Sequence, residues 1–361
     1  MEYSSLLTTV NLGSCKTAPA LQGPSCAYII YRTRASRHDQ IPNLRRGFMS
    51  VLVTGGTGFI GNRIIRKLID RGEEVVCFDL APPRANLEPY LDRIKMYRGD
   101  ITQLPHLLEA INTNGVHKII HMAALLPPDT EERHSYAMQV NIGGTNNVFE
   151  AARWTGIDRV VYASSIAVYG VQDTFGERPI NEDDLNDPIN VYGMTKSVND
   201  FSAKRYIDRH GLDLVGVRIC TVFGHGRVTG MTGMIGGLLM SLPAIGQPVS
   251  MPFHQEEQSP MIHAEDAAEI FVRAALADKL NHPVYISGGS MCSIKEMAEI
   301  VRDIIPDAKI TTGDQLVPHV YNVDNSRMLA DIGYEIAPLR QRILDHINDA
   351  RNEAGMQPLQ G

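Results

Sequence analysis

Three glycines between a predicted strand and a predicted helix constrain the fold of this chain more than any other feature. Residues 51–54 are apolar enough to form a buried strand, and Gly55, Gly58 and Gly61 follow it at regular spacing. From residue 59 to residue 71, apolar side chains recur at helical spacing. The segment therefore predicts a strand, a tight turn and a helix in direct succession.

The spacing of these glycines suits a turn that binds the diphosphate of a dinucleotide. The first glycine permits the tight turn, the second lets the backbone approach the diphosphate, and the third lets the helix pack closely. Phe59 and Ile60 begin the helix, whose free N–H groups and positive dipole end face the same point. A glycine-rich turn without a ligand is the alternative interpretation.

Acidic and small residues follow the next predicted strands. Asp79 ends the strand at 74–79, where a carboxylate can accept hydrogen bonds from the adenosine ribose. Because a carboxylate repels a 2′-phosphate, NAD is favoured over NADP as the cofactor. The cofactor contacts predicted at the ends of the third and fourth strands are Asp100, Ile101, Ala123 and Ala124.

The chain from Met49 onward alternates between predicted strands and predicted helices. The strands are apolar on both faces, which indicates a parallel sheet covered by helices on each side. We therefore expect an α/β fold with a Rossmann-type, doubly wound parallel sheet. Strands are predicted at 51–54, 74–79, 94–98, 117–122, 159–164 and 214–219, and helices at 59–71, 104–112, 137–153 and 191–210.

Clear periodicity ends near residue 220. Residues 221–260 are rich in Gly, Met and Pro, and further helices are predicted at 264–277, 293–304 and 339–351. We expect residues 49–220 to form the dinucleotide-binding domain. Residues 221–361 are expected to form mainly a smaller C-terminal substrate-binding domain, with some segments that return to the main sheet.

Residues 1–48 differ in composition from the rest of the chain. They contain only two acidic residues, Glu2 and Asp39, and no sustained hydrophobic periodicity. Such a segment is compatible with an organelle transit peptide, with a disordered tail that has its own role, or with upstream sequence before a working start at Met49. We favour the third interpretation because the first strand begins directly after Met49. In each case residues 1–48 are predicted to lie outside the fold.

Charge and composition argue against several classes of protein. The formal net charge is −7, which argues against nucleic acid as the main partner. The five cysteines are widely spaced and form no CxxC pair, so we expect reduced thiols in a cytoplasmic protein and no metal site. No apolar segment is long enough to span a membrane. The expected partner is therefore a small-molecule substrate.

A tyrosine and a lysine at helical spacing follow the fifth predicted strand. In the helix predicted at 191–210, Tyr192 and Lys196 lie on one face. Tyrosine has an ordinary pKa of about 10, and a nearby ammonium group lowers it by favouring the phenolate. Ser165, at the end of the fifth strand, is placed to donate a hydrogen bond to a substrate oxygen. These residues predict hydride-transfer chemistry with Tyr192 as the general base.

Together these motifs resemble the extended short-chain dehydrogenase/reductase family, the NAD-dependent epimerase/dehydratase group. The resemblance covers about residues 50–350, and its motifs are TGGTGFIG from residue 54, HMAA from 121, NIGGT from 141, SSIAVYG from 164 and YGMTK from 192. It implies that Tyr192 is the general acid/base, that Lys196 contacts the nicotinamide ribose, and that Ser165 rather than Ser164 is the third catalytic residue.

The same resemblance implies a role for Asn141 and an oligomeric state. Asn141 would support the cofactor site, although a hydrogen bond inside a helix that braces the sheet is the alternative. The helices at 137–153 and 191–210 are those that pair across a dimer in this family. We therefore expect a homodimer.

Two positions depart from the pattern of family members that act on nucleotide sugars. Thr221 stands where those members carry Asn in R-x-x-N-x-x-G, and Ser259 stands where they carry Arg in R-D-x-x-H-V-x-D. A diphosphate needs charge-assisted partners, so both departures favour a dehydrogenase of a small unactivated substrate. That substrate would be a sugar, a sugar acid, a polyol or a hydroxy amino acid. A nucleotide-sugar epimerase or dehydratase and a non-catalytic dinucleotide sensor are the alternatives.

The residues predicted to contact the substrate follow the fourth, fifth and sixth strands. His225 and Arg227 can bind a carboxylate, or they can face solvent. The full set of predicted substrate contacts is Leu125, Tyr169, Thr221, His225 and Arg227.

Overall fold

The computed structural model describes residues 50–360 apart from 84, 228 and 229, so the predictions for residues 1–48 lie outside the described residues. Seven parallel strands form its main sheet: β1 (Ser50–Thr54), β2 (Glu74–Asp79), β3 (Ile94–Arg98), β4 (Val116–His121), β5 (Arg159–Ser165), β6 (Leu214–Ile219) and β10 (Val284–Ile286). Their order is β10-β6-β5-β4-β1-β2-β3. The expected α/β fold with a doubly wound parallel sheet is confirmed.

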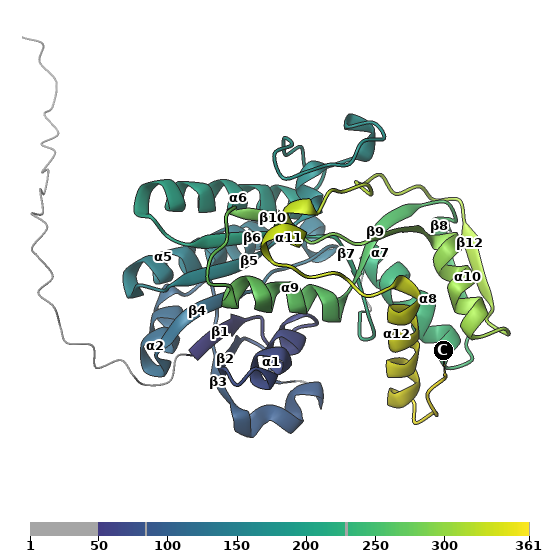
Figure 1. Ribbon diagram of the computed structural model, residues 1–361, viewed down its shortest axis with the longest axis horizontal. Helices are drawn as coiled ribbons and strands as arrows, with labels where there is room; N and C mark the ends of the chain where they lie inside the picture. The colour runs from purple at the N-terminus through teal and green to yellow at the C-terminus, as the bar shows by residue number, and fades with distance from the viewer. Residues whose placement is uncertain (1–49, 84, 228–229, 361) are drawn as a thin grey trace, which may run out of the picture. The chain divides into compact units, whose positions relative to one another are not determined.

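Helices cover both faces of this sheet (Figure 1). One layer contains α1 (Gly61–Asp70) and α9 (Ala264–Leu276), and the other contains α2 (Leu104–Asn114), α5 (Thr145–Thr155) and α6 (Val191–His210). Strand β1 contributes to both, because Val51 and Val53 pack with the α1–α9 layer while Leu52 packs with the opposite layer. Burial on both faces explains why residues 51–53 of β1 form a continuous apolar run, whereas the edge strand β3 is largely exposed.

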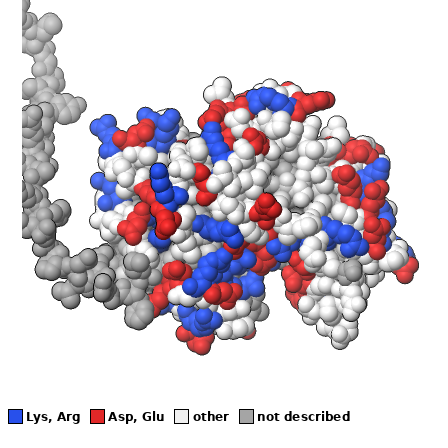
Figure 2. All heavy atoms as spheres, viewed as in Figure 1, with Lys and Arg blue, Asp and Glu red and all other residues white. Residues whose placement is uncertain are grey.

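Ion pairs join α1 to α9 along the surface. Glu265 contacts Arg66 and Lys67, and Glu269 contacts Lys67 and Arg71. Figure 2 shows acidic and basic side chains interspersed on the face drawn, including the region where these two helices lie. The basic side chains of α1 and its C-terminal end are therefore largely neutralised by the glutamates of α9.

The helix predicted at 137–153 is divided by a wider turn. It consists of α4 (His134–Ala137), the π-helix η2 (Met138–Gly144) and α5. In η2 the carbonyl of Asn141 accepts from the side chains of Thr145 and Asn199, at 2.6 and 2.9 Å. Such side-chain donors stabilise a π-bulge by satisfying a carbonyl that the regular helical pattern releases.

The C-terminal third contributes to two parts of the molecule. Helix α9, strand β10 and helix α11 (Ser326–Asp331) lie with the main sheet. The other segments build a separate hydrophobic cluster. Its strands and helices are β7 (Thr221–Phe223), β8 (Val249–His254), β9 (Gln258–His263), β11 (Ser290–Ser293), β12 (Ile310–Gly313), α7 (Gly230–Gly233), η5 (Met234–Leu238), α8 (Leu239–Ala244), α10 (Ile294–Ile304) and α12 (Leu339–Glu353).

The described part of the chain contains three free cysteines, Cys77, Cys220 and Cys292, and all three are buried. No helix among the described residues is long and apolar enough to cross a membrane. Within the same residues, no cluster of His, Cys, Asp and Glu side chains could hold a metal ion.

The short helices that connect strands are η1 (Ala85–Arg93), α3 (Asp129–Glu132), η3 (Ile166–Tyr169) and η4 (Gln172–Thr174).

We predict that stability falls as the pH drops below the ordinary histidine pKa. Burial lowers the pKa of His121 to about 3 and that of His263 to about 4, and it lowers the pKa of His346 well below its ordinary value. The unfolded chain, with histidine pKa values of about 6.5, therefore binds protons first. The stability from these neutral side chains is present above about pH 6.5 and is lost as the pH falls toward 4.

Urea unfolding as a function of pH measures this effect. The variant His263→Gln is expected to show a shallower loss of stability between about pH 6.5 and 4.5 than the unchanged protein. The variant His210→Gln, which removes an exposed histidine, is the control and should keep the original slope. Equal slopes for all three proteins would contradict the prediction.

Candidate functional site

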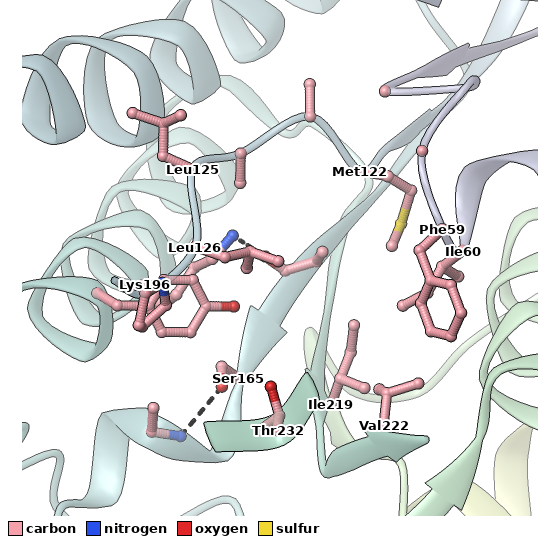
Figure 3. Close-up of a pocket in the computed structure, with 18 of the residues that line it drawn as sticks. Phe59, Ile60, Met122, Leu125, Leu126, Ser165, Lys196, Ile219, Val222 and Thr232 are labelled. Atoms are coloured by element: carbon pink, nitrogen blue, oxygen red, sulfur yellow. Dashed lines mark hydrogen bonds between the residues drawn. The ribbon is translucent and has the colours of Figure 1, made fainter. Parts of the chain in front are cut away.

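A cavity of about 690 Å³ opens at the carboxyl ends of the parallel strands. The residues that follow β1, β2, β3, β4, β5 and β6 all contribute to its wall. Phe59, Ile60 and Met122 lie on one side of it, and Leu125, Leu126 and Lys196 lie on the other (Figure 3). Of the predicted cofactor residues, all except Asn141 line this cavity: Gly55, Gly58, Phe59, Ile60, Gly61, Asp79, Asp100, Ile101, Ala123, Ala124, Tyr192 and Lys196.

The glycine turn leaves no space for a side chain at Gly55, Gly58 or Gly61. A Cβ atom at Gly61 would lie 2.1 Å from the carbonyl oxygen of Gly55, and one at Gly58 would lie 3.0 Å from the same oxygen. Gly55 has a φ of +66°, and a Cβ there would lie 2.7 Å from the amide nitrogen of Ala123. The turn is therefore tight enough for backbone N–H groups to approach a phosphate directly.

Asp79 is held in a fixed orientation at the edge of this turn. Its Oδ2 atom accepts from the amide nitrogen of Thr57 at 3.0 Å and from the Thr57 hydroxyl at 2.8 Å. Its Oδ1 atom accepts from the amide nitrogen of Ala81 at 3.0 Å. Two carboxylate oxygens offer about four acceptor positions, of which three are used, so Asp79 keeps capacity for one hydroxyl of a ribose.

Tyr192, Lys196 and Ser165 all line the cavity, at the end of β5 and on the first turns of α6. The Lys196 ammonium donates to the carbonyl of Ala163 at 2.7 Å and lies 5.5 Å from the centre of the Tyr192 ring. Ser165 Oγ accepts from the amide of Ala167 at 3.1 Å and so keeps its own proton for another acceptor.

The serine that precedes Ser165 has a different environment. Ser164 is fully buried, and its hydroxyl has no hydrogen-bond partner among the described residues. It does not line the cavity, whereas Ser165 does. Strand alternation explains the difference, because successive side chains point to opposite faces.

The pKa values of the tyrosine and the lysine are shifted mainly by burial. Burial raises the pKa of Tyr192, while the Arg227 guanidinium and the Ser165 hydroxyl oppose that rise. Burial lowers the pKa of Lys196 to about 8, and Asp200 opposes that change. Perturbed titratable groups in a cavity are typical of a catalytic site.

The N-terminus of α6, and with it Tyr192, is held by groups that the sequence did not reveal. The amide nitrogens of Val191 and Tyr192 each donate to the Glu131 carboxylate at 3.1 Å. The Asn190 side chain caps the helix by accepting from the amide of Gly193 at 2.7 Å. These N–H groups have no partner inside the helix, so both side chains fix the position of its first turn.

Three predicted site residues lie away from the cavity wall. Asn141 is fully buried. Its Oδ1 atom accepts from the amide of Leu125 at 2.8 Å and its Nδ2 atom donates to the carbonyl of Leu125 at 3.0 Å, which fixes this loop. Tyr169 is fully buried, donates to the carbonyl of Asn181 at 2.8 Å and accepts from Arg218. His225 bonds to Ser241 and Glu353 outside the cavity.

The other predicted substrate residues, Leu125, Thr221 and Arg227, do line the cavity. Several wall residues were not predicted because they come from segments without a periodic pattern. These residues belong to no recognisable motif. They reach the cavity because the C-terminal part of the chain folds back onto it. They include Met231, Thr232, Val317, Pro318, His319 and Val320.

Comparison with known proteins places this site in a family. The model of the NAD dependent epimerase/dehydratase family matches residues 51–287. The chain belongs to this family. Its resemblance to extended short-chain dehydrogenase/reductases is thus confirmed, and NAD is the cofactor of the family.

Individual relatives act on different substrates. A putative UDP-glucose 4-epimerase of Methanocaldococcus jannaschii is 28% identical over 257 residues, which are 70% of this chain and 81% of that protein. A 3β-hydroxysteroid dehydrogenase/Δ5→4-isomerase of Mycobacterium tuberculosis is 35% identical over 181 residues, 48% of this chain and 45% of that protein. Apart from the epimerase, the chain spans about half the length of the first curated relatives it matches.

A solved structure shows the same fold. L-threonine dehydrogenase from Clostridium difficile superposes with a TM-score of 0.77 at 22% identity, over 86% of this chain and 100% of that one. A fold that carries several activities does not determine the substrate. The substrate must be inferred from the cavity itself.

The residues of the glycine turn fit NAD. The Gly55–Gly58–Gly61 cradle excludes side chains where the diphosphate would lie, and Asp79 offers acceptors where the adenosine ribose would lie. Asp100 and Ile101 line the same cavity after β3, where the adenine would lie. Bound NAD supplies the hydride acceptor.

We predict that Gly61→Ala weakens NAD binding. The added methyl group would collide with the carbonyl of Gly55, so the turn must move. We expect the dissociation constant to rise at least about tenfold, which corresponds to about 1.4 kcal/mol.

Gly143→Ala is the matched control, because the nearest atom to its added Cβ is 4.0 Å away. Isothermal titration calorimetry with NAD measures both variants, and circular dichroism checks that each is folded. Equal affinity in Gly61→Ala and the unchanged protein would refute the assignment of this turn to the diphosphate.

Proposed function

We propose that the protein is an NAD-dependent dehydrogenase that oxidises a hydroxyl group of a small hydroxylated substrate. The observation that carries this proposal is the convergence of Ser165, Tyr192 and Lys196 on one cavity that also contains the glycine turn. A non-catalytic dinucleotide sensor would not need these three groups together.

Each of the three residues has a distinct role in this reaction. Ser165 Oγ donates a hydrogen bond to the substrate oxygen, because it accepts its own bond from Ala167 and keeps its proton free. Tyr192 removes the hydroxyl proton as the C–H bond gives up its hydride, which leaves a carbonyl group. The Lys196 ammonium, 5.5 Å from the centre of the Tyr192 ring, favours the phenolate, and the Arg227 guanidinium opposes the rise in the Tyr192 pKa that burial causes.

Arg218 and the substituted family position at Ser259 favour a small substrate over a nucleotide sugar. Arg218 is buried and paired with Asp200, so it is not free to bind a diphosphate. Ser259 is buried and hydrogen bonds to His319 at 2.9 Å. The neighbouring wall is formed by Val317, Pro318 and Val320, which offer a diphosphate no charge-assisted partner.

The principal alternative is an epimerase or dehydratase in which NAD is reoxidised within each turnover. The similarity to the putative UDP-glucose 4-epimerase of Methanocaldococcus jannaschii supports it. The two activities differ in net NADH production, which only the dehydrogenase shows.

We predict that NADH accumulates with at least one member of a panel of uronic acids, aldoses, polyols and hydroxy amino acids. Tyr192→Phe should lower kcat at least about a hundredfold, since general base catalysis typically contributes that much or more. NADH absorbance measures the rate.

Tyr206→Phe is the control, because Tyr206 lies on the same helix but bonds to Asn146 and Glu150 outside the cavity. It should keep the full rate. Conversion of a nucleotide sugar without net NADH would overturn the dehydrogenase proposal in favour of the epimerase.

We also propose that two copies pair through α5 and α6. Phe201 on α6 is 67% exposed and Trp154 on α5 is 56% exposed. Large aromatic side chains that are exposed on adjacent helices commonly mark an interface.

We predict that Phe201→Glu shifts the protein from dimer to monomer, because pairing would bury a charge in each copy. Light scattering measures the mass. Leu185→Glu, at an 84% exposed position outside these helices, is the control and should leave the mass unchanged. A monomeric mass for the unchanged protein would rule out this interface.

A further inference from the structure

Arg227 is partly buried, and it differs in its partners from other arginines that are buried or partly buried. Arg63 lies 3.2 Å from Glu265, Arg218 lies 2.9 Å from Asp200, and Arg342 pairs with Asp266. Across the described residues, no carboxylate lies within 4.0 Å of Arg227. Burial lowers the pKa of its guanidinium. Because charges that are largely removed from water are normally paired, and this partly buried guanidinium lines a cavity, a ligand is expected to supply the anion.

The Arg227 guanidinium is held in place by its surroundings. Its Nε and Nη2 atoms donate to the Thr232 hydroxyl at 3.2 and 2.6 Å. Its Cζ atom lies 5.9 Å from the centre of the Phe59 ring. A Cβ at Gly237 would lie 1.9 Å from the carbonyl of Arg227, so η5 packs directly on its backbone. The side chain is therefore pre-organised before any ligand binds.

Arg227 and Thr232 still have hydrogen-bond donors to offer. Guanidinium has five N–H groups, of which two are used by Thr232. Since the Thr232 hydroxyl accepts from the arginine, its own proton can go to another oxygen. Both residues line the cavity, and Figure 3 shows Thr232 directed into it. The N–H groups that remain on Nη1 and Nη2 of Arg227 can donate side by side, which matches the two oxygens of a carboxylate.

Charge is divided between the two ends of the cavity. The acidic residues on its wall, Asp79 and Asp100, lie at the ends of β2 and β3, where the adenosine would lie. The other end carries Lys196 and Arg227, and no acid from the described residues lines it. Arg227 is also close enough to Tyr192 to oppose the rise in its pKa. An anion bound there would lie near the hydroxyl that Tyr192 deprotonates.

We propose that Arg227 and Thr232 form a carboxylate-binding site, so that the substrate is a small hydroxy acid whose carboxylate anchors it beside Tyr192. This inference rests on the dehydrogenase function proposed above, but it concerns binding and can be measured without turnover. Sugar acids and hydroxy amino acids fit the site, whereas neutral aldoses and polyols leave Arg227 without an anion.

The test compares acids with their neutral amides in the Tyr192→Phe variant loaded with NAD, which removes turnover. Aldonic acids, uronic acids and 3-hydroxy amino acids are titrated by calorimetry, each beside its amide. The acid is expected to bind about 10- to 100-fold more tightly than its amide, since hydrogen bonds to a charged group are stronger than those to a neutral one. Adding Arg227→Gln should remove that difference, and adding Thr232→Val should reduce it.

Controls separate the carboxylate site from its rivals. Lys95→Gln, on β3 outside the cavity, changes a side chain that is 54% exposed, removes a charge elsewhere and should preserve the preference for acids. The dissociation constant of NAD should change less than about twofold in Arg227→Gln. A large rise would instead assign Arg227 to the cofactor diphosphate and overturn the proposal.

Two further outcomes distinguish the carboxylate site from the dehydrogenase function. Failure of every acid in the panel to bind, or equal binding of acids and amides, overturns the carboxylate site. Preferential binding of acids that depends on Arg227, without NADH formation in the unchanged protein, supports the site and overturns the dehydrogenase function. The two proposals therefore fail in distinguishable ways.

Discussion

The buried ion pair between Arg218 and Asp200 joins the elements that hold the catalytic groups. Arg218 lies on β6 and Asp200 on α6, and their side chains are only 7% and 5% exposed. A buried pair is favourable only when further hydrogen bonds satisfy it, and here Tyr162 donates to Asp200 while Arg218 donates to Tyr169.

These partners come from the segments that surround the catalytic residues. Tyr162 lies on β5 three residues before Ser165, and Asp200 lies one helical turn after Lys196. The ion pair and the Tyr162–Asp200 hydrogen bond therefore hold α6, which carries Tyr192, against β6 and β5. At the other end of this arrangement, Glu131 holds the first turn of α6. The relative position of Ser165 and Tyr192 depends on both contacts.

The sequence predicted six of the seven strands of the main sheet, because most of them are short apolar runs between predicted helices, but it missed β10, a three-residue strand from the C-terminal part. It predicted the cofactor turn because only glycine fits beside the carbonyl of Gly55. It missed the π-helix at Met138–Gly144, since the side-chain contacts that stabilise it come from Thr145 within the helix and from Asn199 on another element. Thr232 and His319 were missed for a similar reason, because they reach the cavity only through the path of the C-terminal part.

Arg218 and Arg227 show why sequence motifs alone do not assign such residues. Arg218 lies on β6 and Arg227 follows β7, and either is a plausible anion ligand by residue type. In the structure Arg218 has Asp200 as its counter-ion and acts as a brace, whereas Arg227 has only the Thr232 hydroxyl and lines the cavity. The same side chain is structural where the chain supplies its anion and is available to a ligand where the chain does not. For the substrate end of this cavity, the missing anion is therefore more informative than any motif.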